Sequence, residues 1–279
     1  MPHRWTAPAI LLLAASSVLA NPGSRLWATG GVTTIEGSAG GGLTPWALLS
    51  GYASSGEWGG IVNLSSTRVD DYSLEVQAAG VSFDHRVELT FARQRFKLDT
   101  LGGELEQDVF GAKFRLLGDA VYTPYGQWSL GLQHKRQRDF DLPNAVGAED
   151  DSGTDVYLTG SKLFLNAIAG RNLLLNAGVR ATRANQTGLL GFGGDQGDSY
   201  EAVAEASAGL FLNRQWLVGS EYRQKPDNLG FAKEDDWKDV FVAYIPTREL
   251  AVTAAWVDLG NIAGLKDQTG FYLALQGAF

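Results

Sequence analysis

Apolar and polar residues alternate one by one along much of the chain, which is the pattern of a β-strand with one face in an apolar environment. In residues 110–116 the charged residues Lys113 and Arg115 share one face, and the other face is apolar throughout. Three further segments with the same alternation are 87–91, 128–132 and 173–179. The pattern predicts an all-β fold. Because one face of a soluble sheet alternates in the same way, the connectors must decide between water and a membrane.

The connectors from residue 97 onward alternate strictly between long and short. The long ones are 97–107, 138–153, 185–199, 226–236 and 260–269, and the short ones are 123–126, 166–171, 213–215 and 246–248. Transmembrane barrels show this rhythm because short turns join their strands at the periplasmic rim and longer loops at the outer rim. Aromatic residues such as Trp128 and Trp216 flank the short turns, as in a girdle at a membrane interface. We therefore predict an antiparallel up-and-down transmembrane β-barrel.

The segments with strand character give the size of this barrel. In chain order they are 25–34, 45–53, 60–68, 72–82, 86–96, 108–122, 127–137, 154–165, 172–182, 200–212, 215–225, 237–245, 249–258 and 270–279. An even number is needed if both chain ends are periplasmic, so we expect about fourteen strands. If the weak segment 25–34 and its neighbour 45–53 pack inside the barrel instead, twelve strands remain as the alternative.

The first twenty residues have the form of a cleaved signal peptide. A basic start at Arg4 is followed by an apolar stretch over residues 7–15 and by small residues before Asn21. That stretch is too short to span a membrane as a helix, and no later segment has eighteen uninterrupted apolar residues. We expect residues 1–20 to be removed on export and residues 21–279 to form a single barrel in the outer membrane of a Gram-negative bacterium.

The last predicted strand is apolar on one face and ends on Phe279, the final residue. Outer-membrane barrels commonly end this way, because the barrel-assembly machinery recognises a terminal strand with a last aromatic residue. We expect Phe279 to act as an assembly signal of this kind.

Composition narrows the classes further. The chain has 35 glycines, 30 aromatic residues of the Trp, Tyr and Phe types (8 + 9 + 13) and a mean hydropathy of only -0.10, as expected when apolar and polar faces alternate. It has no cysteine, which excludes disulfides and thiolate metal sites. Without Arg4 the mature chain has 22 basic and 31 acidic residues, a net charge of -9. That sign argues against a nucleic-acid partner.

Two segments carry a resemblance to a known family. Residues 182–194 read TRANQTGLLGFGG and residues 35–47 read IEGSAGGGLTPWA; the weaker matches are EYRQKPDNL at 221–229 and VTAAWVDLGNIA at 252–263. With these segments the chain resembles a proteobacterial family of outer-membrane proteins of unknown function, over nearly all of the mature sequence. The resemblance implies an outer-membrane barrel and supplies no substrate or catalytic residue.

The polar faces of the strands supply the residues expected to line the lumen. They are Glu75, Glu88, Lys113, Arg115, Lys135, Arg180, Glu205, Glu221 and Arg223. A barrel of about eight strands is just filled by its own side chains, so a wider lumen must hold water or a segment of the chain. These charged groups would then form a salt-bridged filling or line a water-filled channel.

The long connector 185–199 is unusual because its centre is apolar, with Leu189, Leu190 and Phe192 among glycines. An outer loop in water has no reason to present three large apolar side chains together. We expect the loop to enter the lumen and narrow it, with Arg180 and Arg183 near its base and Glu205 or Glu221 available as partners. Contact with a neighbouring protomer or with lipopolysaccharide is the alternative.

Candidates for enzymatic chemistry are few. His134 shares the predicted lipid face near the outer end of its strand, where an outer-membrane lipid hydrolase would hold its histidine, but no glycine-flanked serine lies near it in sequence. The acidic runs 149–151 and 234–236 do not have the ligand spacing of a dedicated calcium loop. We predict no catalytic residue, no metal site and no cofactor.

The leading hypothesis is therefore a pore or passive transporter for small solutes. A structural or envelope-assembly barrel without a conducting pore is the main alternative, because a barrel fold does not imply a channel; a lipid hydrolase is the third. The expected partners are outer-membrane lipid, lipopolysaccharide and the barrel-assembly machinery, with the solute unspecified.

Overall fold

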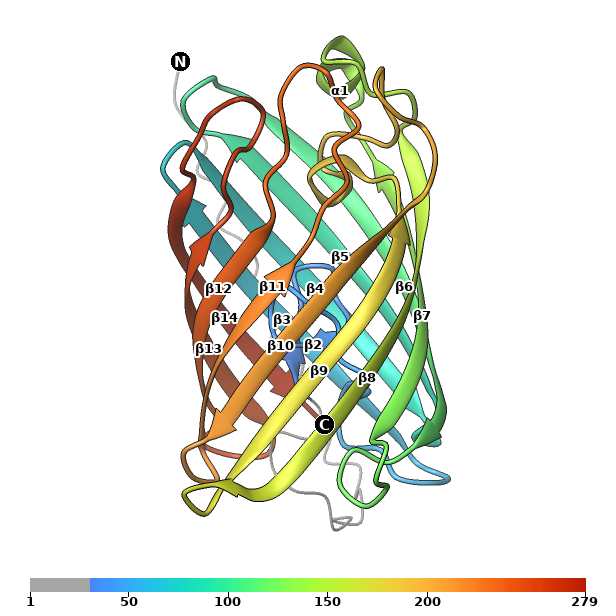
Figure 1. The fold of residues 1–279 in the computed structure, drawn as a ribbon, viewed down its shortest axis with the longest axis vertical. Coiled ribbons are helices and arrows are strands. Elements are labelled where there is room, and N and C mark those ends of the chain that lie inside the picture. Colours follow the sequence, from blue (N-terminus) through green and yellow to red (C-terminus); the bar gives the residue numbers. More distant parts are fainter. Residues whose placement is uncertain (1–30) are drawn as a thin grey trace, which may run out of the picture.

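The computed structural model describes residues 31–279, and its main element is a closed antiparallel barrel of twelve strands (Figure 1). The strands are β3 (Trp58–Val69), β4 (Tyr72–Phe83), β5 (Val87–Leu98), β6 (Glu104–Gly118), β7 (Gln127–Gln137), β8 (Ser152–Ile168), β9 (Arg171–Thr182), β10 (Glu201–Phe211), β11 (Trp216–Arg223), β12 (Trp237–Tyr244), β13 (Leu250–Asp258) and β14 (Thr269–Ala278). Each strand pairs with its sequence neighbours, and β14 closes the ring on β3. Closure leaves no strand edge unpaired. The predicted all-β antiparallel barrel is confirmed.

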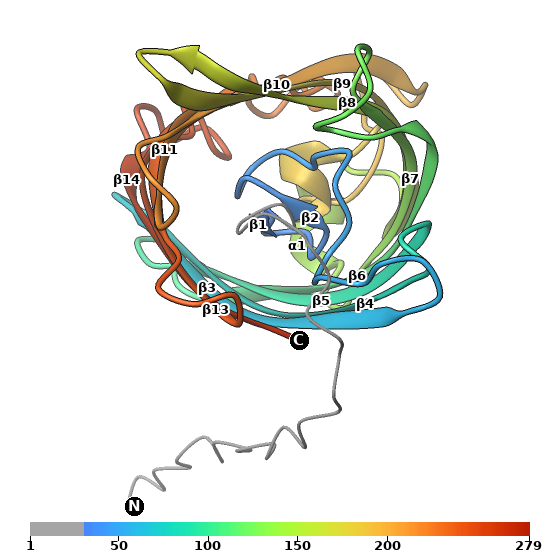
Figure 2. The same cartoon turned by 90° about the horizontal axis from the view of Figure 1, so that it is seen from below.

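The predicted count of fourteen wall strands is wrong, and the twelve-strand alternative is correct. Residues 45–53 form no strand of the wall, and the short strands β1 (Val32–Thr33) and β2 (Ala39–Gly40) pair only with each other, inside the ring (Figure 2). Every residue from 32 to 51 is buried, so this stretch has no face that lipid could cover. The predicted signal peptide, residues 1–20, lies outside the described residues.

The other predicted strands are found within a few residues of their expected ends. The largest shift is in β6, which starts and ends four residues earlier than expected, because a turn forms at Asp119. There the Asp119 carboxylate accepts hydrogen bonds from the backbone N–H groups of Val121 and Tyr122 at 2.8 and 3.0 Å. Such side-chain bonds to nearby backbone end a strand by offering its backbone an alternative partner.

Two short helical elements lie in the long connectors: α1 (Asp141–Ala145) and the 3-10 helix η1 (Asn185–Gly188). Among residues 31–279 there is no helix with the length and apolar character needed to cross a membrane.

The chain end completes the closure of the barrel. The backbone of Phe279 exchanges two hydrogen bonds with Gly60, at 2.8 and 2.9 Å, and its ring meets Trp58 edge to face at 5.9 Å between centroids. A Cβ atom on Gly60 would lie 2.4 Å from the Phe279 ring, so only glycine leaves room for this packing. The role of Phe279 as an assembly signal stays a prediction.

Replacing Gly60 by valine is expected to displace the Phe279 ring and weaken the seam between β3 and β14, because the two side chains would need the same space. The folded fraction, measured as the form that resists SDS until it is boiled, should fall. Ala79→Val is the matched control, since Ala79 pairs with Val62 on the exposed outer surface. An equal folded fraction in both variants would show that this contact does not limit closure.

Candidate functional site: the filled lumen

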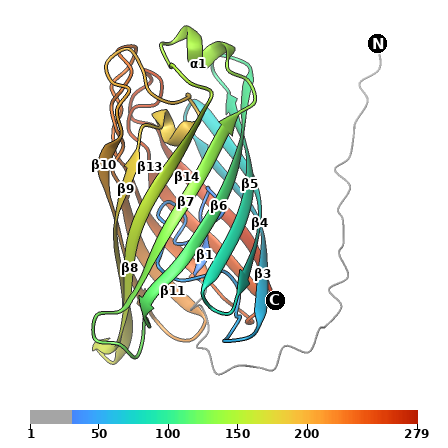
Figure 3. The same ribbon diagram turned by 90° about the vertical axis from the view of Figure 1, so that its right-hand side faces the viewer.

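The lumen of the barrel is occupied by residues 31–53, which we call the plug segment (Figures 2 and 3). Among residues 31–279, the backbone hydrogen bonds of the plug segment to other backbone groups all stay within the segment, such as Ile35 to Gly42 at 2.9 Å and Trp46 to Ala39 at 3.0 Å. Its polar contacts with the wall run through side chains instead. The plug segment is therefore not part of the sheet.

One carboxylate of the plug segment meets three cations of the wall. Glu36 lies 2.5 Å from the ammonium of Lys135, 2.8 Å from the guanidinium of Arg223 and 3.4 Å from that of Arg180. Two wall carboxylates complete the cluster: Asp155 contacts Lys135 and Arg180, and Glu205 contacts Arg180 and Arg223. Three acids thus balance three cations, with all six side chains at most 3% exposed. Charges this deeply buried are tolerated only when they are paired and hydrogen-bonded.

A second anchor forms around Glu88 of β5. Its carboxylate lies 3.2 Å from the Lys113 ammonium and accepts hydrogen bonds from the backbone N–H and the hydroxyl of Ser50, both at 2.7 Å. Lys113 in turn donates to the backbone carbonyls of Ala39 and Leu48 at 3.0 and 2.9 Å. Glu88 also accepts the Ala39 N–H at 3.3 Å, so one buried ion pair of the wall satisfies five polar groups of the plug segment.

A third anchor lies on the opposite side of the plug segment. The Glu221 carboxylate of β11 accepts hydrogen bonds from the backbone N–H of Leu43 at 2.7 Å and from the hydroxyl of Thr44 at 2.5 Å. Ala47 is held at both polar backbone groups, because its N–H donates to the Ser161 hydroxyl at 2.8 Å and its carbonyl accepts from the Ser129 hydroxyl at 2.6 Å. Polar side chains of β5 to β8 and of β11 thus hold the plug segment by hydrogen bonds from different sides of the ring.

The connector 185–199 lies at the long-loop end of the barrel. Leu189, Leu190 and Phe192 are buried, and η1 lies at the mouth of the barrel (Figure 3). The Gln137 amide donates to the carbonyls of Gly188, at 2.9 Å, and Leu189. The Lys135 ammonium donates to the carbonyl of Thr187 at 3.1 Å while it also pairs with Glu36. The loop and the plug segment therefore meet at one wall lysine.

A second loop packs over this one. Lys225 pairs with Glu234 at 3.2 Å and donates to the Gln186 side chain at 2.8 Å, and Glu234 accepts the Gln186 backbone N–H at 2.8 Å. Burial raises the pKa of the Glu234 carboxyl and lowers the pKa of the Lys225 ammonium, because each loses hydration. The two loops are locked together at Gln186.

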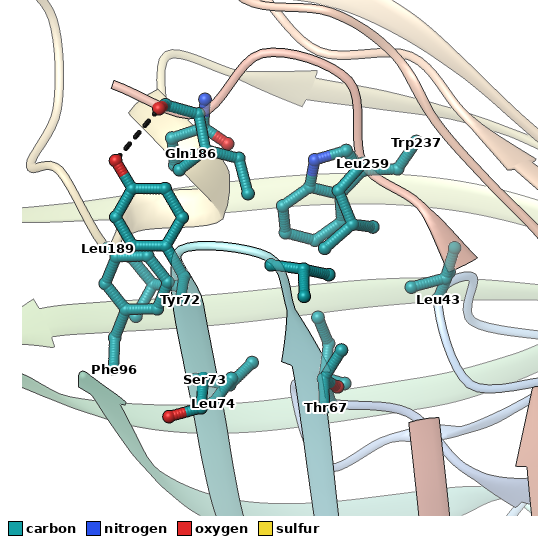
Figure 4. A pocket seen from close by; sticks show the side chains of 13 residues that line it. Leu43, Thr67, Tyr72, Ser73, Leu74, Phe96, Gln186, Leu189, Trp237 and Leu259 are labelled. Atoms are coloured by element: carbon teal, nitrogen blue, oxygen red, sulfur yellow. Dashed lines mark hydrogen bonds between the residues drawn. The ribbon is translucent and has the colours of Figure 1, made fainter. Parts of the chain in front are cut away.

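A small apolar cavity remains between the plug segment and the loops (Figure 4). It is lined by Tyr72, Phe96, Leu189 and Trp237, and Tyr72 donates to the carbonyl of Ile262 at 3.1 Å. Its volume of about 30 Å³ holds one or two water molecules.

The structure places most of the predicted lumen residues on the inner face. Glu88, Lys113, Lys135, Arg180, Glu205, Glu221 and Arg223 are all buried inside the barrel, in contact with the plug segment or with groups that hold it. Arg115 lies at the short-turn end, where it donates to the carbonyl of Gly118 and contacts Asp119 at 3.8 Å. Whether any of them lines a pathway stays a prediction.

Glu75 is a correction, because its side chain lies on the outer surface, half exposed and paired with Lys97 at 2.5 Å. On β4 the apolar residues Leu74 and Val76 face inward. Alternation separates the two faces of a strand without telling which is inside. Here the plug segment and the loops form an apolar core within the lumen, so the apolar face turns toward them.

Two residues of the charge cluster were missed by the sequence reasoning. Glu36 lies in a glycine-rich segment without periodicity, so no pattern marks it. Asp155 stands at the start of β8 on the face that continues with Tyr157 and Thr159, both buried. Asp155 already lies within the predicted strand 154–165, and the alternation of that strand places its side chain in the lumen with those of Tyr157 and Thr159. Arg183 lies at the base of the loop as expected, where its carbonyl accepts the Gly193 N–H at 2.8 Å, but its side chain pairs with Asp150 and Asp198.

His134 lies on the outer surface, where its Nδ1 atom is 3.0 Å from the hydroxyl of Thr154. Among the described residues, no carboxylate is hydrogen-bonded to the His134 ring. No group of three or more His, Asp or Glu side chains within residues 31–279 is arranged to hold a metal ion.

The closed up-and-down ring with its inward polar groups is the architecture of bacterial outer-membrane porins. The chain belongs to the family described as "Protein of unknown function (DUF3034)", whose model matches residues 29–276. No curated protein sequence matches it.

The chain is similar to several solved structures, of which the KdgM porin supports the fold. The KdgM porin has a TM-score of 0.51 at 10% identity over 78% of this chain and 99% of its own. The outer membrane protein Omp33 of Acinetobacter baumannii has a TM-score of 0.47 at 13% identity over 80% and 99%. Outer membrane phospholipase A of Escherichia coli has a TM-score of 0.36 at 7% identity over 81% and 96%.

Lys113→Met is expected to lower the free energy of unfolding by about 3 kcal/mol, because it leaves the buried Glu88 carboxylate without its cation. Adding Glu88→Gln should recover part of that loss, since no unpaired charge then remains. Urea unfolding of the barrel in detergent, followed by tryptophan fluorescence, measures both. The single variant Glu88→Gln is measured as well. If the free energy of unfolding lost in the double variant equals the sum of the losses in the two single variants, the ion pair is not an anchor.

Proposed function

We propose that this protein is an outer-membrane pore for small solutes, closed in the present structure by its own plug segment. The long-loop end faces the cell exterior and the short turns face the periplasm. The observation that carries the proposal is that residues 31–53 fill the lumen without joining the sheet. A filling of this kind can leave without breaking a single strand pair of the wall.

The contacts of the plug segment are of the type that a switch requires. Beside the apolar packing of Ile35 and Trp46, they include the ion pairs of Glu36 and the hydrogen bonds that Lys113 and Glu221 of the wall make with the segment. If the segment moves out, these groups become the lining of a water-filled lumen and regain hydration. A charged lumen then sets the selectivity for solutes.

The loop 185–199 supplies the outer part of the closure in this proposal. Leu189, Leu190 and Phe192 pack at the mouth, above the Glu36 cluster. Since Lys135 contacts both Thr187 and Glu36, movement of the loop and movement of the plug segment are coupled through that side chain.

A structural barrel without conductance is the second candidate. It is favoured by the complete burial of Glu36 and its partners, because separating a buried charge cluster is costly. The two candidates differ in one respect only, namely whether the plug segment ever leaves the lumen.

Recording in planar bilayers with the plug segment locked or free distinguishes them. Ala47→Cys and Ser161→Cys place two cysteines where the Ala47 N–H now bonds the Ser161 hydroxyl, and the chain has no other cysteine. Joined as a disulfide or by a short thiol-reactive linker, they should abolish conductance steps. The unlinked protein should show them, because the plug segment is free to leave.

The control carries Ser66→Cys and Glu75→Cys, a cross-strand pair on the outer surface of the wall. Linking this pair should leave the conductance unchanged. A locked plug segment that conducts like the free one would refute gating by this segment, and an unlinked protein silent at every potential would support the structural barrel.

A further inference from the structure

One side of the barrel carries charges on its outer surface. On β5 the outward residues are Leu89 and Phe91 in the half near the short turns. They are Arg93, Arg95 and Lys97 in the half near the long loops. The outward residues of the neighbouring strands also become charged toward the long-loop end. The outward charged residues on β3–β7, with the residue after β7, are Arg68, Glu75, Arg93, Arg95, Lys97, Glu104, Glu106, Asp108, Arg136 and Arg138, which we call the outer charged face.

The strand registers place these residues in rows. Arg93 pairs with Asp108, which pairs with Arg136, and Arg95 pairs with Glu106. Directly below, Phe91 pairs with Phe110 and Phe110 with His134. The rows run from an aromatic level near mid-barrel to a charged level at the long-loop end.

The outer charged face does not lie against hydrocarbon. An Arg or Lys on the lipid face costs about 2–4 kcal/mol at the bilayer midplane and little near the interface. Buried residues such as Val76, Phe96 and Val109 alternate with the outer charged residues along these strands, so the charged side chains point away from the lumen. They must face headgroups or another polar partner.

The adjoining strands β12 to β14 differ. On β12 to β14 the outward residues Val240, Trp256 and Phe271 are apolar and exposed, and the one outward ion pair there joins Lys238 to Asp258 at 3.2 Å. The charged surface therefore ends at β3, where Arg68 pairs with Phe271 of β14, whereas a general solvated rim would continue along these strands.

The cations of the outer charged face have donors to spare. Arg93 holds Asp108 at 2.8 Å, and Arg95 holds Glu106 at 2.9 Å, yet both side chains remain over 40% exposed. Within residues 31–279, Arg68 and Arg136 have no ion-pair or hydrogen-bond partner for their side chains. Six cations stand against four carboxylates, a local charge of +2 in a chain of net charge -8.

We propose that the outer charged face binds the phosphorylated headgroup of lipopolysaccharide. Arginine presents a planar fork of donors that matches phosphate oxygens, and the free guanidiniums of Arg136 and Arg68 offer it. The aromatic row at Phe91 and Phe110 lies where the acyl chains of the same lipid begin.

The experiment uses the full mature protein, folded in a detergent free of lipopolysaccharide. Purified rough-type lipopolysaccharide, and the same lipid with its phosphates removed, are titrated and binding is counted by native mass spectrometry. The parent should bind the phosphorylated lipid. Arg136→Gln with Arg138→Gln should weaken that binding roughly tenfold or more, because charge-assisted hydrogen bonds are lost.

Lys238→Gln is the matched control, since Lys238 is an outward, exposed cation near the long-loop end of β12, outside the outer charged face. It should bind the lipid as the parent does. Equal affinity in the arginine variant and the control, or equal binding of the dephosphorylated lipid, would overturn the proposal. So would a dimer of the parent that the arginine variant dissolves, because the face would then be a contact between two copies of this chain.

Discussion

The contact between the Glu36 carboxylate and the cations of Lys135, Arg180 and Arg223 is the interaction on which the rest of the structure depends. A ring of twelve strands encloses more space than wall side chains fill, since about eight strands is the size that they fill. The remaining space is taken by a segment that the sheet does not hold. Three buried cations on the wall would be unstable without an acid from that segment. The charge balance of the lumen therefore fixes where the segment lies.

The filling also determines which way the strands of the wall face. Where the lumen holds the plug segment's polar backbone, as beside Ser129 and Glu221, the inner face of the wall is polar. Where it holds apolar loop residues, as beside Tyr72 along β4 and the long-loop half of β5, the inner face is mostly apolar and the charges lie outside. One barrel thus has two kinds of wall, and the change between them follows the contents of the lumen.

The sequence predicted the wall well, and physical reasons account for this. A period of two with a strict rhythm of long and short connectors leaves few arrangements open, and β7 (Gln127–Gln137) has its predicted ends. The apolar centre of the loop 185–199 indicated that Leu189 and Phe192 need cover, and both are buried in the structure. Their role as a constriction stays a prediction.

What the sequence could not predict is what the lumen contains. A segment buried on every side, such as residues 32–51, has no periodicity, so its apolar run was assigned to the wall. Glu36 could not be singled out, because its importance comes from three cations far away in the chain. Glu75 was assigned to the wrong face because alternation does not tell inside from outside.

Hydrogen exchange tests most directly whether the plug segment is a separate element held by its charges. The backbone amides of residues 31–53 and of the strands β13 and β14 are compared in the parent and in Glu36→Gln, both folded in detergent. The account predicts faster exchange in residues 31–53 of the variant, with the strand amides unchanged. Unchanged exchange in residues 31–53, or an equal acceleration in the strands, would contradict it, because the segment would then be an inseparable part of the barrel.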